Sequence, residues 1–516
     1  MLKRGKINLA GCLIGLSVCV LLALMSRKVI DHVPLYDELL HFLSARGLLS
    51  TGQPVIADGL YSRAALFTRI VAFSLDHFGS TPVAARLPAL FFQMVLFVLL
   101  AMWVTRRVGL LGGFTAALVL CLQPTTIELA VFARFYTLHA LVITALGIIL
   151  YEVSTADRSL RFRLIGGVAA LLLTGVGLHL QETTIIAFGA FAAGVAAVLA
   201  CDHWSYVAGF CRRYPLQIAG GVVLLVVGVA GAAFFLGLIQ RLGEAPLWAM
   251  HSAHRPFYYL VTFAQSTPFL WPVFPLIAVA AFLTHQRLTL FCLIALAITV
   301  VMHSIAAQKS LRYIYYVMPF LCIVWGAAID GMFRYLRSIG TDVGSRRKLH
   351  PVAILALIGV PLLFSLEGQR AVKLALGRLT PLEALGYAVE AEWSSAVPVL
   401  QPLAGAADRI VTSNAMKSIY YLGRYDYELN ASIVTETDTT LEFGRDERTG
   451  RPAIGTAEST RKVLDMPGKT LVVLEQETMN LDSGVSAAAG AEIVSRCTAV
   501  ALPAEAALSA WECTHR

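Results

Sequence analysis

The sequence predicts a polytopic α-helical membrane protein that ends in a small, more polar α/β domain. Its mean hydropathy is +0.70, and only 14% of its 516 residues are charged. Soluble globular proteins carry about 25% charged residues. Several apolar runs also approach or exceed the ~20 residues that are needed to cross a bilayer. These three observations exclude an ordinary soluble protein.

About eleven apolar stretches are predicted as transmembrane helices by their length and composition. They cover residues 8–26, 84–104, 108–124, 127–151, 163–180, 184–200, 216–238, 268–284, 288–304, 313–333 and 351–366. Basic residues precede the first stretch, as in a signal peptide, but Ser26-Arg27-Lys28 is a poor cleavage site. We therefore expect an uncleaved first helix.

Basic residues gather in alternate loops between these stretches. The clusters are Lys3/Arg4/Lys6, Arg106/Arg107, Arg158/Arg161/Arg163, Arg212/Arg213, Arg287 and Arg334/Arg337/Arg346/Arg347/Lys348. By the positive-inside rule these loops are cytoplasmic. The prediction is therefore a plasma-membrane protein with its N-terminus in the cytoplasm and its C-terminal domain outside. The formal net charge of +8 follows this alternation and does not indicate nucleic acid as a partner.

The predicted domains are a transmembrane domain over residues 1–367 and an extracytoplasmic α/β domain over residues 368–516. Within the second domain, a helical stretch precedes Leu422-Gly423-Arg424, and the strand-like runs cover residues 409–412, 470–474 and 492–500. Such an order of strand, helix and strand indicates a small α/β fold. Cys497 and Cys513 can pair in an oxidising compartment, and the sequence leaves open whether they do.

The two main outer loops are expected at residues 27–83 and 239–267. In the first loop, residues 39–49 and 63–78 have apolar and polar faces at helical spacing, which indicates helices lying in the membrane interface. The second loop is rich in aromatic residues and histidine. It is interpreted either as an interfacial aromatic belt or as a cover over a lipid-linked sugar.

Two adjacent acids, Asp37 and Glu38, lie in the first outer loop, with His41 one helical turn later. Carboxylates at a membrane surface are costly unless water, cations or a partner compensate them. One interpretation is structural: Pro34 starts a helix, and the acids favour its positive end. The functional interpretation is a general base for a hydroxyl that attacks an anomeric carbon. A metal site of Asp37, Glu38 and His41 would need ligands from elsewhere.

Four cations, Arg86, Arg134, Lys309 and Arg312, lie near the predicted outer surface. Any one of them can be explained by snorkelling to lipid headgroups. Several on one leaflet, opposite acids, favour binding of a lipid phosphate, because guanidinium groups form bidentate bonds to phosphate oxygens.

Further polar residues stand at the predicted outer ends of helices. Glu128 is expected to pair with Arg134 or with a histidine. His179, at the end of a span, is interpreted as a structural or headgroup contact before a catalytic base. The full set of candidate substrate-binding residues is His41, Arg86, Glu128, Arg134, Tyr136, His179, Glu182, Arg312 and Tyr313.

In their order along the chain, five short motifs resemble those of the C-type glycosyltransferases, which are polytopic membrane enzymes. The motifs are Tyr36-Asp37-Glu38 with His41, Ala85-Arg86-Leu87-Pro88, Glu128 with Ala133-Arg134-Phe135-Tyr136, Arg312-Tyr313 before Met318-Pro319, and Tyr420-Tyr421-Leu422-Gly423-Arg424. The chain is most similar to the bacterial branch that includes protein O-mannosyltransferases and aminoarabinose transferases, which implies a bacterial inner membrane. The large lectin-like insertion of the eukaryotic members is missing.

The resemblance implies an inverting transfer of a sugar from a polyprenyl-phosphate carrier to a lipid, polysaccharide or protein acceptor at the outer face. Asp37 would be the base, and Glu38 would orient the acceptor or the donor sugar. Arg86, with Arg134 or Arg312, would hold the phosphate. No cofactor or metal is expected beyond the lipid-linked donor, because the paired DxD signature of pyrophosphate-using members is absent.

Two other classes of function remain open at this point. A transporter or flippase for an amphipathic lipid would also place acids and arginines at membrane depth, although near the midplane. A non-catalytic scaffold with a sensory tail would tolerate replacement of Asp37. The sequence does not identify the sugar, the acceptor, the carrier length, the role of the C-terminal domain or the oligomeric state.

Overall fold

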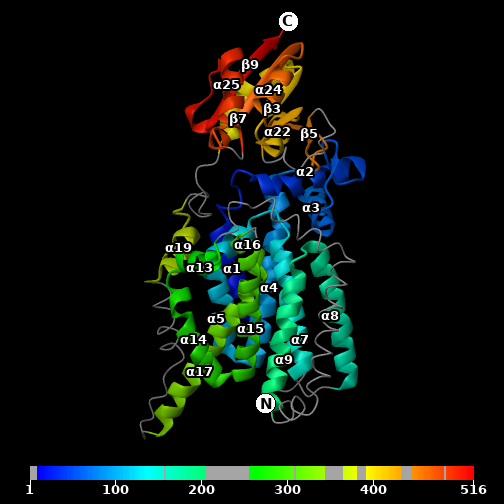
Figure 1. Cartoon of the computed structure of the whole chain (residues 1–516). Coiled ribbons are helices and arrows are strands. Elements are labelled where there is room, and N and C mark those ends of the chain that lie inside the picture. Colours follow the sequence, from blue (N-terminus) through cyan, green and yellow to red (C-terminus); the bar gives the residue numbers. More distant parts are fainter. Residues whose placement is uncertain are drawn as a thin grey trace. The chain divides into compact units, whose positions relative to one another are not determined.

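The computed structural model describes residues 9–155, 159–204, 255–306, 309–342, 364–379, 391–431, 443–481 and 484–515 (Figure 1). The predicted span 216–238, most of the span 351–366 and much of the second outer loop lie outside the described residues. By contact, the chain divides into two compact units. We call them the helical unit (Met1–Val29, Ala89–Val131 and Phe135–Thr380) and the mixed unit (Ile30–Pro88, Phe132–Arg134 and Pro381–Arg516). The predicted domain boundary at 367/368 stays a prediction.

The helical unit is built from membrane-length helices and a few short ones. Its helices are α1 (Leu9–Ser26), most of α4 (Pro82–Arg107), α5 (Leu110–Leu122), α6 (Pro124–Ala130), α7 (Tyr136–Thr155), α8 (Leu160–Leu180), α9 (Thr184–Asp202), α13 (Tyr258–Ser266), α14 (Leu270–Thr284), α15 (Gln286–Ile305), α16 (Leu311–Ile314), η2 (Tyr315–Val317), α17 (Met318–Asp342) and α19 (Leu366–Ala375).

Seven described helices are long and apolar enough to cross a membrane, or up to nine if each of two bent pairs counts as one span. The bent pairs are α5 with α6, at 72°, and α13 with α14, at 103°. The prediction of a polytopic helical membrane protein is confirmed. The count of eleven spans stays a prediction, because two predicted spans fall largely on residues outside the described ranges.

Close packing in the helical unit depends on small residues. A Cβ added to Gly326 of α17 would lie 2.4 Å from the carbonyl oxygen of Gly112 in α5. A Cβ on Gly15 of α1 would likewise lie 2.6 Å from the Cα of Val98 in α4. Since lipid tails supply little hydrophobic driving force between helices, such close backbone approach is a main source of attraction in a membrane.

One predicted span was wrong in its extent. We expected a continuous helix over residues 127–151, but α6 ends at Ala130 and α7 begins at Tyr136. In the break, the backbone N–H of Ala133 donates to the Glu38 carboxylate at 2.9 Å. Hydropathy does not reveal this break, because residues 131–133 are as apolar as a helix and a distant carboxylate satisfies the freed N–H.

The mixed unit combines the C-terminal sheet with most of the predicted first outer loop, which we call the acidic loop because it carries Asp37 and Glu38. The loop forms α2 (Tyr36–Thr51), the strands β1 (Val55–Ile56) and β2 (Gly59–Leu60), α3 (Ala65–Phe78) and the start of α4. The two helices expected in the loop are confirmed, and their position in a membrane interface stays a prediction.

The described C-terminal part alternates strands and helices. It contains α21 (Trp393–Ala406), β3 (Arg409–Thr412), α22 (Ala415–Leu422), β4 (Tyr427–Leu429), β5 (Gly444–Arg445), β6 (Pro452–Ile454), α24 (Ala457–Leu464), β7 (Gly468–Glu475), η3 (Gln476–Thr478), α25 (Ala487–Arg496), β8 (Thr498–Val500), η4 (Ala504–Ala506) and β9 (Leu508–His515).

The strands form one seven-stranded sheet in the order β5-β6-β4-β3-β7-β9-β8. The central strands β6, β4, β3 and β7 are parallel, and β5, β9 and β8 pair antiparallel. The predicted strands at 409–412 and 470–474 and the helix before Gly423 are confirmed. A small α/β region therefore exists as predicted.

The strand expected at residues 492–500 was largely wrong. Residues up to Arg496 belong to α25, and only Thr498–Val500 is a strand. The Ser486 side chain caps α25 by accepting from the N–H of Ala489, and Ala489 and Ile493 share its buried face. The β-branched residues suggested a strand. The Ser486 cap and the buried pair of Ala489 and Ile493, spaced i,i+4, instead stabilise a helix.

A disulfide joins Cys497, at the end of α25, to Cys513 in β9, across 16 positions in the sequence. The sequence left this pairing open. A cross-link over a loop of about 15 residues stabilises a domain by about 3 kcal/mol, mainly by restricting the unfolded chain. It therefore ties β9, the strand next to the edge strand β8, to the end of α25.

We expect reduction of this disulfide to destabilise the C-terminal region. A Cys497→Ser/Cys513→Ser variant should lose about 3 kcal/mol of unfolding free energy, because its unfolded chain is less restricted. The measurement is thermal or denaturant unfolding of the purified protein with and without reductant. The control, Cys201→Ser, replaces an exposed free cysteine and should change nothing. Equal stability of the double variant and the wild type would contradict this assignment.

Candidate active site

Glu38 lies at the centre of the acidic loop and is only 2% exposed. It occupies the first turn of α2, and its carboxylate accepts the backbone N–H of Leu35 at 3.0 Å. Leu35 is the extended residue before the helix. A carboxylate here satisfies a backbone donor that has no partner within the helix, and it also interacts favourably with the helix dipole.

Arg86 of α4 is the main partner of Glu38 and is fully buried. Its Nε and Nη2 donate to the two oxygens of Glu38 at 2.8 and 2.7 Å. Its Nη1 donates to the carbonyl oxygens of Ile30 and His32 at 2.7 and 2.8 Å, and Nη2 also lies 3.2 Å from the His32 ring. These contacts account for the five N–H donors of a guanidinium group.

The environment of Glu38 keeps it ionised. Burial alone would raise the pKa of its carboxyl group, but the charge and hydrogen bonds of Arg86, together with His32, outweigh burial and hold the pKa well below its usual range. The same carboxylate also receives the N–H of Ala133. Glu38 therefore joins the start of α2, the start of α4 and the break before α7.

Asp37 has a different environment from its neighbour. It is partly exposed, whereas Glu38 is buried. Its backbone carbonyl accepts from Nη1 of Arg134 at 3.1 Å, and the same nitrogen lies 3.2 Å from the Tyr61 hydroxyl. Arg134 is 3% exposed. Arg134 thus lies beside the acidic pair, where it contacts the backbone of Asp37.

His41 is fully buried on α2. Its Nδ1 lies 2.9 Å from the hydroxyl oxygen of Thr68 in α3, and the rings of Tyr61 and Phe67 pack edge-on against it. Burial, followed by the nearby charges of Arg134 and Arg63, lowers the pKa of His41 well below its ordinary value. A neutral imidazole in this position joins α2 to α3.

The metal site considered for Asp37, Glu38 and His41 finds no support in the described residues. No three side chains of histidine, cysteine, aspartate or glutamate gather there closely enough to hold an ion. The expectation that transfer needs no metal ion stays a prediction.

A second group of candidate residues lies within the helical unit. The Arg312 guanidinium lies over the rings of Tyr136 and Tyr313, at 6.0 and 5.4 Å from their centroids. The two rings lie 6.3 Å apart. This places three predicted substrate-binding residues from α7 and α16 together, in cation–π geometry.

Glu128 of α6 interacts electrostatically with Arg370 of α19. We had expected its partner to be Arg134 or a histidine, and Arg370 was not among our candidates. His179 and Glu182 lie on exposed positions at the turn between α8 and α9. The structure therefore adds a cation to the candidate site and leaves these last two residues at a surface.

Three residues that contact the candidates were not predicted from the sequence. His32 contacts Arg86, Tyr61 contacts Arg134, and Thr68 contacts His41. They lie in the predicted first outer loop, and only that location could have drawn attention to them. Arg370 lies three positions after an acid, Glu367, just beyond the last predicted span. An acid and a base so close to a predicted membrane span could have marked Arg370 as a candidate site residue.

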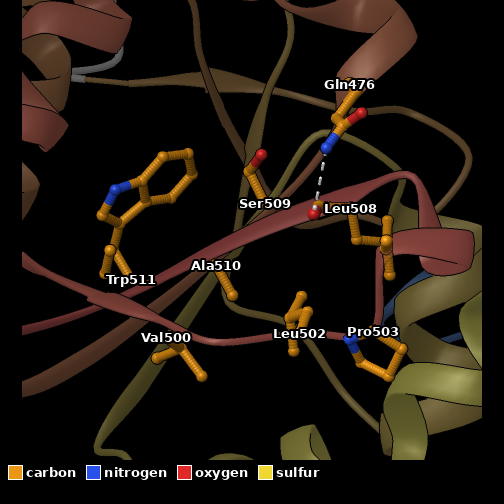
Figure 2. Close-up of a pocket in the computed structure, with 10 residues that line it drawn as sticks. Gln476, Val500, Leu502, Pro503, Leu508, Ser509, Ala510 and Trp511 are labelled. Atoms are coloured by element: carbon orange, nitrogen blue, oxygen red, sulfur yellow. Dashed lines mark hydrogen bonds between the residues drawn. The ribbon is translucent and has the colours of Figure 1, made fainter.

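The C-terminal sheet carries a separate hollow of about 200 Å³ beside β8 and β9. Figure 2 shows Trp511, Val500, Leu502 and Pro503 around it, with the Gln476 amide donating to the Leu508 carbonyl oxygen. None of its ten lining residues has a titratable side chain. This hollow therefore offers no acid or base.

The fold is similar to those of the solved structures described below, and this likeness supports the resemblance noted in the sequence. No protein-family model matches the chain, and no curated protein matches it either. The comparison with solved structures, in contrast, gives matches along nearly the entire chain.

Three of these structures illustrate the likeness. The crystal structure of ArnT from Cupriavidus metallidurans bound to undecaprenyl phosphate has 17% identity and a TM-score of 0.60, covering 97% of each chain. The apo state of that protein matches with the same identity and TM-score. The archaeal oligosaccharyltransferase AglB from Archaeoglobus fulgidus, in complex with an inhibitory peptide and a dolichol-phosphate, has 13% identity and a TM-score of 0.55, over 90% of this chain and 69% of its own.

We expect Glu38→Gln to destabilise the protein by about 3–5 kcal/mol, because it leaves the buried Arg86 charge uncompensated. The wild-type pair should stabilise the fold at pH values above about 4.3, the ordinary pKa of a glutamate. This stabilisation should disappear as the pH falls toward the lower pKa of the folded state. The measurement is thermal unfolding of the purified protein between pH 3 and pH 7.

The control is Glu492→Gln, which removes the acid of a surface pair with Arg461. Exposed pairs contribute little to stability, so this variant should unfold close to the wild type. A Glu38→Gln protein as stable as its control would show that the buried pair is not a main support of the acidic loop.

Proposed function

We propose that this protein is a membrane glycosyltransferase that moves a sugar from a polyprenyl-phosphate carrier to an acceptor at the outer face of the inner membrane. The observation that carries the proposal is the likeness over 97% of both chains to a structure that holds undecaprenyl phosphate. The acidic pair and the arginines at predicted outer helix ends support the same chemistry.

Asp37 is the proposed general base. It takes the proton of an acceptor hydroxyl while the hydroxyl oxygen attacks the anomeric carbon. The bond between that carbon and the phosphate oxygen breaks, and the polyprenyl phosphate leaves with the electron pair. A single displacement of this kind inverts the anomeric centre. Partial exposure favours Asp37 over Glu38 for this role, since a base must reach its substrate.

Glu38 and Arg86 are proposed as positioning residues. From the resemblance we expected Arg86 to hold the donor phosphate. Its five donors are engaged inside the protein, with Glu38, His32 and the Ile30 carbonyl. A phosphate would have to displace one of these bonds. We therefore keep Arg134 and Arg312 as the candidates for phosphate binding.

Arg312 is suited to that task because its planar cation lies against Tyr136 and Tyr313. Aromatic faces hold a guanidinium in place, and the planar fork of guanidinium donors matches the oxygens of a phosphate. Arg370, which interacts with Glu128, is added as a further candidate from the structure. His179 and Glu182 remain proposed contacts to substrate.

The orientation of the chain in the membrane is part of the proposal. The positive-inside rule predicts a cytoplasmic N-terminus. The Cys497–Cys513 disulfide supports an oxidising compartment for the C-terminal domain, because such bonds rarely persist in a reducing cytosol. An extracytoplasmic domain can meet a lipid, polysaccharide or protein acceptor on the outer side.

We expect Asp37→Asn to lower sugar transfer by about 100-fold or more, since asparagine keeps the shape of the side chain but cannot accept the proton. The measurement is transfer of radiolabelled sugar from polyprenyl-phosphate donors into lipid, glycan and protein fractions of membranes. The fraction that takes up label identifies the acceptor class. Transfer should continue in EDTA if no metal ion is needed.

The control is Asp76→Asn, at an exposed acid on α3 in the same unit, and it should transfer at the wild-type rate. Equal label in Asp37→Asn and wild type would remove Asp37 as the base. Absence of transfer from every polyprenyl-phosphate donor would favour the transporter or the scaffold. Loss of transfer in EDTA would overturn the metal-free reaction.

A further inference from the structure

The turn at residues 446–451, between β5 and β6, is held in one conformation by its own hydrogen bonds. The Asp446 carboxylate accepts from the backbone N–H and from Nε of Arg448 at 3.0 and 2.8 Å, and from the Thr449 hydroxyl at 3.1 Å. Asp446 is 3% exposed and Thr449 is fully buried. The proposed chemistry does not use this turn.

One side of the turn contacts the residue before the proposed base. The Arg448 guanidinium lies over the ring of Tyr36, 5.5 Å from its centroid. Tyr36 is the first residue of α2, and Asp37 follows it directly. Residues at the start of a helix lack the full set of helical hydrogen bonds. A cation stacked on Tyr36 therefore adds a restraint on the first residue of the helix.

The other side of the turn contacts the β1–β2 hairpin. The N–H of Asp58 donates to the Thr449 carbonyl oxygen at 2.9 Å, and Arg451 pairs with the Asp58 carboxylate at 2.7 Å. A Cβ added to Gly59 would lie 2.6 Å from the Arg448 carbonyl oxygen. The hairpin and the turn therefore approach backbone to backbone, which only a glycine at position 59 permits.

This second contact also leads to Asp37. One residue after β2, the Tyr61 hydroxyl bonds Arg134, and the same Arg134 nitrogen donates to the Asp37 carbonyl. The turn thus acts on Asp37 from two directions. Arg448 holds the residue before it, and the hairpin holds the arginine that binds its backbone.

We propose that the 446–451 turn of the C-terminal domain positions Asp37 for catalysis, with Arg448 as its main positioning residue. The inference rests on the proposed function and gives the C-terminal domain a role in the same reaction. Its physical basis is that a base must be held in a near-attack geometry, and a misplacement of about 1 Å can cost about 100-fold in rate.

A buried acid beside the turn supplies an independent readout. Glu428 of β4 is 1% exposed. Burial raises the pKa of Glu428 to about 8. The charge of Arg448 and the N–H of Ala415 oppose this rise, whereas the charge of Asp446 adds to it. The hydroxyl groups of Tyr36 and Tyr425 also interact with the charge of Glu428. Because the folded pKa lies above the ordinary value of about 4.3, the stability that protonated Glu428 contributes is lost as the pH rises from about 4.3 to about 8.

The test compares Arg448→Met, Arg448→Lys and Gly59→Ala with wild type in the full-length protein in lipid nanodiscs. Methionine keeps the length but loses the charge, and alanine separates the two backbones without changing any charge. For Arg448→Met and Gly59→Ala we expect kcat to fall by about 10- to 100-fold, as for a misplaced base, with the KM for the lipid donor within about twofold. Lysine should recover part of the rate.

Amide hydrogen exchange of residues 33–41 is measured on the same samples. We expect faster exchange in Arg448→Met and Gly59→Ala, because the start of α2 opens more often. The control is Arg461→Met, at a surface pair on α24, which should leave both the rate and the exchange unchanged. Glu428→Gln should make the unfolding free energy less dependent on pH between about 4.3 and about 8.

The proposal is overturned by unchanged kcat in folded Arg448→Met and Gly59→Ala, or by unchanged exchange at residues 33–41. An increased KM at normal kcat would also overturn it, since that result marks a binding role. If the wild type transfers no sugar, the proposed function fails, and hydrogen exchange still decides whether the turn holds the loop. If Arg448→Met does not fold, Gly59→Ala and Tyr36→Leu give the same comparison.

Discussion

The buried pair of Glu38 and Arg86 is the interaction on which the rest of the acidic loop depends. Removing two charges from water is costly, and only excellent geometry with further hydrogen bonds compensates for it. Here Glu38 also accepts backbone N–H groups from Leu35 and Ala133. One ion pair therefore connects the start of α2, the first turns of α4 and the break before α7.

This arrangement separates the roles of two adjacent carboxylates. Glu38 is buried, paired and used inside the protein, whereas Asp37 remains partly exposed. Environment assigns different tasks to chemically similar acids in many active sites. The costly pair holds the helix start that carries the proposed base, so the base itself can stay accessible to an acceptor.

The C-terminal domain belongs to the same compact unit as the acidic loop. Tyr420 of α22 packs its ring 5.5 Å from Phe42 of α2, in addition to the contacts of the 446–451 turn. A domain without a recognisable catalytic motif can thus act on catalysis through packing.

The sequence by itself determined the helical membrane class, the acidic pair and several C-terminal elements, because composition and short-range periodicity encode them. The tertiary structure alone decided the partners: Arg86 for Glu38, Arg370 for Glu128 and Arg448 for Tyr36. It also decided the break after Ala130 and the helix at Ala487–Arg496. Hydropathy reports only neighbours along the chain, whereas these features depend on hydrogen bonds, charges and packing between residues far apart in sequence.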